Sequence, residues 1–128
     1  MDQEWAPTLW AVTLVVTDLE ASKAFYAAAF DAPRVFEDAN SAVLRFGPTV
    51  INLLHRPAAD ELLAPSPVGA PGDAPRIVFT VPVPDTDAYC VRLAARGVTL
   101  LNGPMTRPWG PRTASFLDLD GHCWEIAS

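Results

Sequence analysis

Hydrophobic residues in the first half of the chain follow the spacing of one helix and several strands. Residues 9–16 form a continuous apolar run, rich in β-branched residues, that predicts a strand buried on both faces. The next segment carries apolar side chains at helical spacing as far as Phe30. Thr17 or Asp18 can cap this helix, and Pro33 ends it. Short apolar runs at residues 34–37, 41–46 and 49–54, separated by turn residues, predict three more strands.

The same order of elements returns in the second half of the chain. Residues 76–81 predict a strand, residues 86–96 a helix that ends at Gly97, and residues 98–101, 112–118 and 122–127 three strands, with a loop at 102–111. Residues 57–75 are rich in proline and predict a connector with one helical turn at 58–64. The pattern therefore predicts an α+β fold of two tandem βαβββ modules, residues 9–56 and 76–127, within a single domain spanning residues 1–128. In this repeat Ala11 corresponds to Arg76, and Asn52 to Glu125.

Composition and charge narrow the classes of function. With 9 basic and 15 acidic residues the net charge is −6, which argues against nucleic-acid binding and favours neutral or cationic ligands over anionic ones. The longest apolar run is too short to span a membrane, and the acidic start at residues 1–4 lacks the basic region of a secretion signal. Cys90 and Cys123 form neither a disulfide framework nor a zinc motif. These features predict a cytoplasmic protein that binds neither membranes nor nucleic acid.

Two segments are similar to a known superfamily. Residues 12–26, VTLVVTDLEASKAFY, resemble the opening of the vicinal oxygen chelate superfamily, which includes glyoxalase I, extradiol dioxygenases, and fosfomycin- and bleomycin-resistance proteins. The Pro-Trp-Gly at residues 108–110 and DLDGH at residues 118–122 resemble its usual ending, with Leu119 in place of a proline and His122 in place of an asparagine. The resemblance implies two βαβββ modules whose mixed sheet curls around a shared cleft, with helices outside, commonly in a homodimer.

The resemblance also implies where a metal would be held. Metal-dependent members place a ligand on the first and last strand of each module, and the matching positions here are Ala11, Asn52, Arg76 and Glu125. Only Glu125 is a strong ligand, since Ala11 has no donor, Asn52 is a weak neutral ligand and Arg76 is permanently charged. We therefore expect no metal and no other cofactor, and we expect Arg76 to form an ion pair with Glu125. His55 should point to the opposite strand face, and His122 should lie in a solvated turn.

Strand alternation indicates what the cleft would offer a ligand. Its predicted lining is mostly apolar with a few convergent polar groups, which is typical of a small-molecule pocket, although the same residues could instead fill a core. Trp10 and Trp109 offer flat aromatic surface for a planar ligand, whereas Trp5 and Trp10 could instead pack at a subunit interface. The candidate ligand-binding residues are Trp10, Thr13, Asn52, Leu54, Arg76, Val78, Trp109, Arg112 and Glu125.

The sequence leaves three functions open. The favoured one is a metal-independent, non-catalytic homodimer of the bleomycin-resistance type, which sequesters an aromatic, neutral or cationic antibiotic. The alternative is a metal-dependent enzyme of the glyoxalase or dioxygenase type. The third is a structural or regulatory dimer without a pocket. The missing metal ligands favour binding over catalysis.

Overall fold

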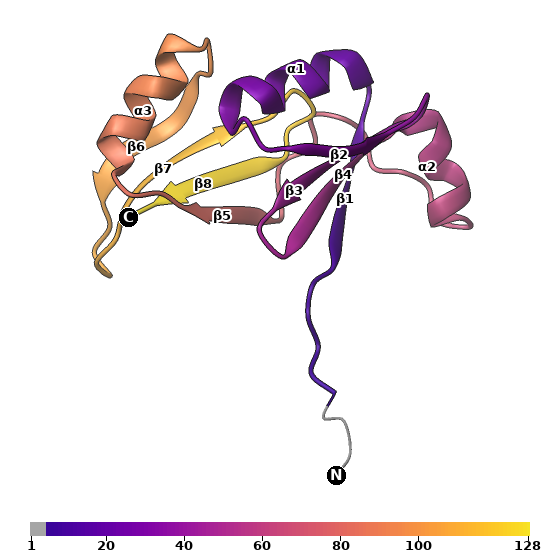
Figure 1. Cartoon of the computed structure of the whole chain (residues 1–128), viewed down its shortest axis with the longest axis horizontal. Helices are drawn as coiled ribbons and strands as arrows, with labels where there is room; N and C mark the ends of the chain where they lie inside the picture. Colours follow the sequence, from indigo (N-terminus) through magenta and orange to yellow (C-terminus); the bar gives the residue numbers. More distant parts are fainter. Residues whose placement is uncertain (1–4) are drawn as a thin grey trace.

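Within residues 5–128, eight strands divide between two four-stranded sheets, accompanied by three helices (Figure 1). The computed structural model describes residues 5–128, so the acidic start at residues 1–4 lies outside the described residues. The first module comprises, in chain order, β1 (Ala11–Val16), α1 (Leu19–Ala29), β2 (Arg34–Glu37), β3 (Ser41–Phe46) and β4 (Thr49–His55). After α2 (Arg56–Leu63) the second comprises β5 (Val78–Pro82), α3 (Thr86–Ala95), β6 (Leu100–Thr106), β7 (Arg112–Leu117) and β8 (Cys123–Ala127).

The two sheets share one topology. Their strand orders are β1-β4-β3-β2 and β5-β8-β7-β6. In each, the first and last strands of the module pair in parallel, and the remaining neighbours are antiparallel. The predicted α+β fold of two tandem βαβββ modules is confirmed.

The main helices begin at aspartate caps. The Asp18 side chain accepts a hydrogen bond from the backbone N of Ala21 at 3.0 Å, and Asp85 accepts one from Ala88 at 3.1 Å. These bonds satisfy backbone donors that a helix start leaves free. Of the two predicted caps for α1, Asp18 therefore makes the capping hydrogen bond and Thr17 does not.

The hydrophobic core joins the two modules. Tyr26 on α1 of the first module is buried against Trp124 on β8 of the second, with ring centroids 5.8 Å apart. The ring centroid of Phe25, on the same helix, lies 6.1 Å from that of Phe116 on β7. Burying a large aromatic side chain contributes about 1.5–3 kcal/mol, so α1 is a principal contact between the two sheets.

Three predicted boundaries differ from the observed ones at the first strand and the connector. The first strand begins at Ala11, because Leu9 and Trp10 extend beyond the sheet and are exposed. The helix α2 has eight residues, two turns rather than the predicted one. β5 begins at Val78, where its pairing with β8 starts at Cys123, so Arg76 precedes the strand.

The first half of the predicted loop at 102–111 belongs to a strand. β6 runs to Thr106, because Met105 and Thr106 pair with Thr113 and Arg112 on β7 after two register shifts. A pattern search misses this continuation because the irregular pairing breaks the period of two that marks a strand.

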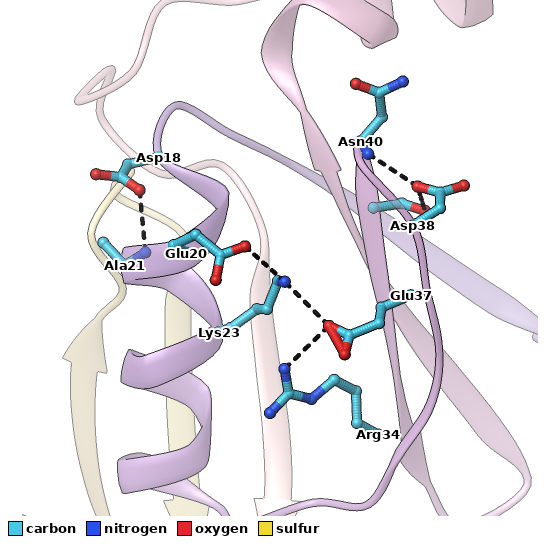
Figure 2. A network of polar contacts seen from close by, with 9 residues as sticks. Asp18, Glu20, Ala21, Lys23, Arg34, Glu37, Asp38 and Asn40 are labelled. Atoms are coloured by element: carbon cyan, nitrogen blue, oxygen red, sulfur yellow. Dashed lines mark hydrogen bonds and ion pairs between the residues drawn. The ribbon is translucent and has the colours of Figure 1, made fainter.

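A surface network of charges links α1 to the edge strand β2 (Figure 2). Lys23 Nζ lies 2.6 Å from Glu20 and 3.0 Å from Glu37, and Arg34 lies 3.1 Å from Glu37. Glu20, in the first turn of α1, thus pairs with Lys23 one turn further along the helix. Hydrogen bonds to Glu20 and Glu37 raise the pKa of Lys23. The carboxylates of Glu20 and Glu37 are exposed to solvent, and pairs with exposed partners contribute little to stability.

Among the helices of residues 5–128, none combines the length and the apolar character needed to cross a membrane.

Candidate functional site: the open faces of the two sheets

Each sheet has one face packed under α1 or α3 and one face turned away from these helices. On β1 the alternation is plain, since Leu14 and Val16 are buried in the core while Thr13 is exposed. On β4 the core residues are Ile51 and Leu53. We call the other side the open face; its residues are Thr13, Val15, Val50, Asn52, Leu54, Val78, Thr80, Thr113, Ser115, Cys123 and Glu125. Three of these residues on the second sheet, Thr113, Ser115 and Cys123, are themselves buried.

On the first sheet the open face holds a polar pair with an unsatisfied acceptor. Thr13 and Asn52 are register partners, and Asn52 Nδ2 donates to Thr13 Oγ1 over 3.4 Å. Asn52 Oδ1 is buried and has no hydrogen-bond partner among residues 5–128. A buried acceptor without a donor costs about 1–3 kcal/mol. This oxygen therefore marks a place where a donor from another molecule would be stabilising.

On the second sheet one polar row crosses all four strands. Thr80 pairs with Glu125, Glu125 with Ser115, and Ser115 with Asn102 on β6. Thr80 Oγ1 donates to Glu125 Oε1 at 2.8 Å. A hydroxyl, rather than a cation, thus faces the half-buried Glu125 carboxylate.

The predicted ion pair between Arg76 and Glu125 is wrong. Within residues 5–128, the ion pairs do not include these two side chains. Arg76 lies before β5 and is exposed, whereas Glu125 pairs with Thr80, four residues further along. The prediction failed because it extended β5 two residues too far toward the N-terminus.

Arg107, which the sequence did not single out, lies at the edge of this polar row. Its Nε donates to Thr113 Oγ1 at 2.8 Å and its Nη2 to Asn102 Oδ1 at 3.1 Å. Its guanidinium carbon lies 5.9 Å from the centroid of the Trp109 ring. Arg107 lies one residue beyond the end of β6, where no strand period places a side chain, so the sequence pattern gave no indication of its position.

The remaining predicted ligand-binding residues separate into two groups. Trp10 and Trp109 are 83% and 72% exposed, Val78 is exposed, and Leu54 is half-buried on the open face. Arg112 lies on the helix-covered face instead. Its Nε contacts both carboxylate oxygens of Asp87 on α3, at 2.9 and 3.0 Å. Arg112 is therefore removed from the candidate ligand site, because strand alternation turns it toward α3.

A separate pocket lies beside the connector between the modules. It has a volume of about 310 Å³ and is bounded by α2, the connector, β1 and the turn between β7 and β8. Of the predicted site residues, Arg76 lines this pocket, whereas Thr13, Asn52 and Glu125 do not. The fold thus places Arg76 and Glu125 in different surroundings.

His122 belongs to a buried polar network under α1. Asp118 accepts hydrogen bonds from Tyr26 Oη at 2.5 Å and from His122 Nδ1 at 2.8 Å, and Trp124 Nε1 donates to Tyr26 Oη at 2.9 Å. The Asp118 hydrogen bond raises the pKa of His122. Burial alone would raise the pKa of Asp118, but the bonds from His122 and Tyr26 outweigh it and lower that pKa. The expectation of a solvated His122 is wrong, and the network is structural.

The chain's side chains do not fit the metal site of metal-dependent relatives. The helix caps Asp18 and Asp85 align the two modules, so Ala11 corresponds to Val78, the first residue of β5, rather than to Arg76. Asn52 pairs with Thr13 as Glu125 pairs with Thr80, so the predicted correspondence of Asn52 to Glu125 agrees with the register. With Val78 in place of Arg76, Glu125 is still the one strong ligand of the set. Across residues 5–128, no three His, Cys, Asp or Glu side chains gather in a metal-binding cluster.

Comparison with known proteins places this geometry in a family. The model of the Glyoxalase/Bleomycin resistance protein/Dioxygenase superfamily matches residues 8–126. A glyoxalase-related enzyme from Fulvimarina pelagi is 26% identical, with a TM-score of 0.82 over 95% of this chain and 88% of that one.

Two other solved structures share the fold. A glyoxalase/bleomycin resistance protein/dioxygenase from Nocardioides is 23% identical, with a TM-score of 0.84 over 98% of this chain and 85% of that one. A lactoylglutathione lyase from Agrobacterium tumefaciens is 21% identical, with a TM-score of 0.75 over 95% and 93%. No curated protein matches the chain. Since the family model spans almost its whole length, the chain belongs to the Glyoxalase/Bleomycin resistance protein/Dioxygenase superfamily.

Proposed function

We propose that this protein binds a small aromatic molecule without a metal, and that it sequesters an antibiotic in the cytoplasm of the producing or exposed cell. The observation that carries the proposal is the unsatisfied Asn52 Oδ1 on the open face. A buried acceptor without a donor lowers the stability of the fold. Such groups are common at functional sites, where a bound ligand supplies the missing donor. The exposed ring of Trp109 supplies flat apolar surface for stacking.

We favour metal-free binding over metal-dependent catalysis because of the side chains at the metal-ligand positions. A catalytic metal site needs about three protein ligands, and the positions that correspond to such a site offer Glu125 alone. The second candidate, an enzyme of the glyoxalase or dioxygenase type, is favoured by one observation. Glu125 is a half-buried carboxylate on the open face, and among residues 5–128 its one hydrogen bond comes from Thr80. A carboxylate in such a place is a candidate general base.

We also propose that two copies associate. Residues 5–10 extend from the body without regular structure, and Trp5, Leu9 and Trp10 are 83%, 71% and 83% exposed (Figure 1). Exposed tryptophans clustered on one segment are typical of an interface. Sedimentation analysis should give a dimer that W5A/W10A weakens; a monomer across the micromolar range would contradict it.

The binding proposal is tested with Asn52→Leu. This substitution replaces the unpaired amide by an apolar group of similar size, so we expect the free energy of unfolding to rise by about 1 kcal/mol. We expect the same variant to bind its antibiotic at least tenfold more weakly, by fluorescence titration against a panel of aromatic antibiotics that includes bleomycin. Asn40→Leu, in the exposed turn before β3, is the control and should leave affinity unchanged.

The outcomes separate the two candidates. If N52L raises the free energy of unfolding and lowers the affinity for the antibiotic, Asn52 has a ligand-binding role. Unchanged affinity in N52L would remove Asn52 from the site. Stoichiometric metal in the purified protein, with turnover of a glyoxalase or dioxygenase substrate that Glu125→Gln abolishes, would favour the enzyme.

A further inference from the structure

The open face of the second sheet carries a fixed cation and a fixed anion that do not pair with each other. Arg107 is half-buried and held by two hydrogen bonds to neutral groups, Thr113 Oγ1 and Asn102 Oδ1. Glu125 is half-buried and bonded to the Thr80 hydroxyl. Among the ion pairs of the described chain, neither side chain takes part.

The sheet register sets how far apart these two groups lie. Thr113 pairs with Ala127 and Ser115 pairs with Glu125, so Thr113 is the diagonal neighbour of Glu125. Diagonal neighbours on an antiparallel pair are about 7–8 Å apart. Since Arg107 is bonded to Thr113, its guanidinium lies within the reach of one small molecule that also contacts Glu125.

The guanidinium is oriented before any ligand arrives. Two of its nitrogens, Nε and Nη2, donate to Thr113 and Asn102, and within the described part of the chain Nη1 makes no hydrogen bond. Its carbon lies 5.9 Å from the centroid of the Trp109 ring, which is 72% exposed. A fixed fork suits a carboxylate or another planar acid, and losing little side-chain freedom on binding improves affinity.

We propose that the ligand is dipolar, with an acidic group bound by Arg107, a flat ring against Trp109 and a basic or hydrogen-bond-donating group bound by Glu125. This inference rests on the proposed binding function and specifies its ligand class. A ligand with one charge of each sign is neutral overall, so it is compatible with the net charge of −6. It also explains why an arginine and a glutamate share one face without forming an ion pair.

The test uses three probes that share a ring. They are para-(aminomethyl)benzoic acid, which carries both charges, para-toluic acid, which carries the acid alone, and para-methylbenzylamine, which carries the base alone. Affinities are measured by NMR titration of isotope-labelled protein, following the Nε–H of Arg107 and the indole N–H of Trp109. We expect the dipolar probe to bind about tenfold more tightly than either singly charged probe.

Two variants test the acidic and the basic ends of the ligand separately. Arg107→Gln should weaken the dipolar probe and para-toluic acid about tenfold and leave para-methylbenzylamine unchanged. Glu125→Gln should weaken the dipolar probe and the amine and leave the acid unchanged. Arg76→Gln, in the connector pocket, removes a charge elsewhere and should change none of the three affinities. The Arg107 Nε–H shift in the unaltered protein reports contact even where R107Q is poorly folded.

Each contrary result has a distinct meaning. Equal affinity for all three probes, or an R76Q effect as large as that of R107Q, overturns the dipolar ligand. Failure of all three probes to shift the Arg107 and Trp109 signals also overturns it. If aromatic antibiotics still bind through Asn52 in that case, the proposed function stands and only the ligand class is wrong.

Discussion

Tyr26→Phe is expected to destabilise the fold strongly although it removes a single oxygen. Tyr26 Oη donates to Asp118 Oδ2 and accepts from Trp124 Nε1, and both Tyr26 and Trp124 are 1% exposed. A hydrogen bond to a charged group contributes about 1.5–3 kcal/mol, and a buried donor left unpaired costs about 1–3 kcal/mol. We therefore expect a loss of about 3–5 kcal/mol. That is a large part of the total for a domain whose stability is about 5–15 kcal/mol.

The matched control is Tyr89→Phe. Tyr89 Oη donates to the backbone oxygen of Ala29 at 2.7 Å, but the residue is half-buried and its partner is neutral, so about 1 kcal/mol is expected. Urea unfolding followed by far-ultraviolet circular dichroism measures both variants, with equal slopes as the check that the unfolded states are comparable. If Tyr26→Phe lowers the free energy of unfolding no more than Tyr89→Phe does, the hydrogen bonds among Tyr26, Asp118 and Trp124 do not stabilise the contact between the modules.

Two further predictions test the network and the strand β6. His122 has a pKa raised above its ordinary 6.5 by Asp118, so its contribution is complete below that pH and is lost as pH rises through the folded value. His122→Asn should therefore flatten the fall in unfolding free energy above pH 6.5, and an unchanged slope would contradict the pairing. Gly103→Ala should cost about 3 kcal/mol or more by thermal melting, because its φ is +88° and an added Cβ would lie 2.5 Å from a backbone oxygen of β7. Gly47→Ala, where φ is +60° and no atom lies within 4 Å, should cost only about 1 kcal/mol; equal costs would rule out the clash.

The order of elements was predictable from local patterns because strands and helices differ in the period of their apolar residues. The buried alternation of Leu14 and Val16 on β1, and the cap at Asp18, depend on neighbours within a few residues. The positions of Thr13 and Asn52 on a shared face followed from the same alternation. The Phe25, Tyr26 and Phe30 face of α1 also followed from sequence, but its contacts with Trp124 of the other module did not.

The sequence by itself determined that the chain forms two βαβββ modules and that three of the four metal-ligand positions lack a strong donor, because both conclusions need only residue identities and periods. The tertiary structure decided which polar groups meet. The register of β5 against β8 gives Glu125 a threonine rather than Arg76. The position of α3 over one face of β7 brings Arg112 to Asp87, and the irregular pairing of β6 brings Arg107 to Thr113. Such contacts depend on where a strand starts and how it pairs, and a shift of one or two residues changes the partner of every side chain along it.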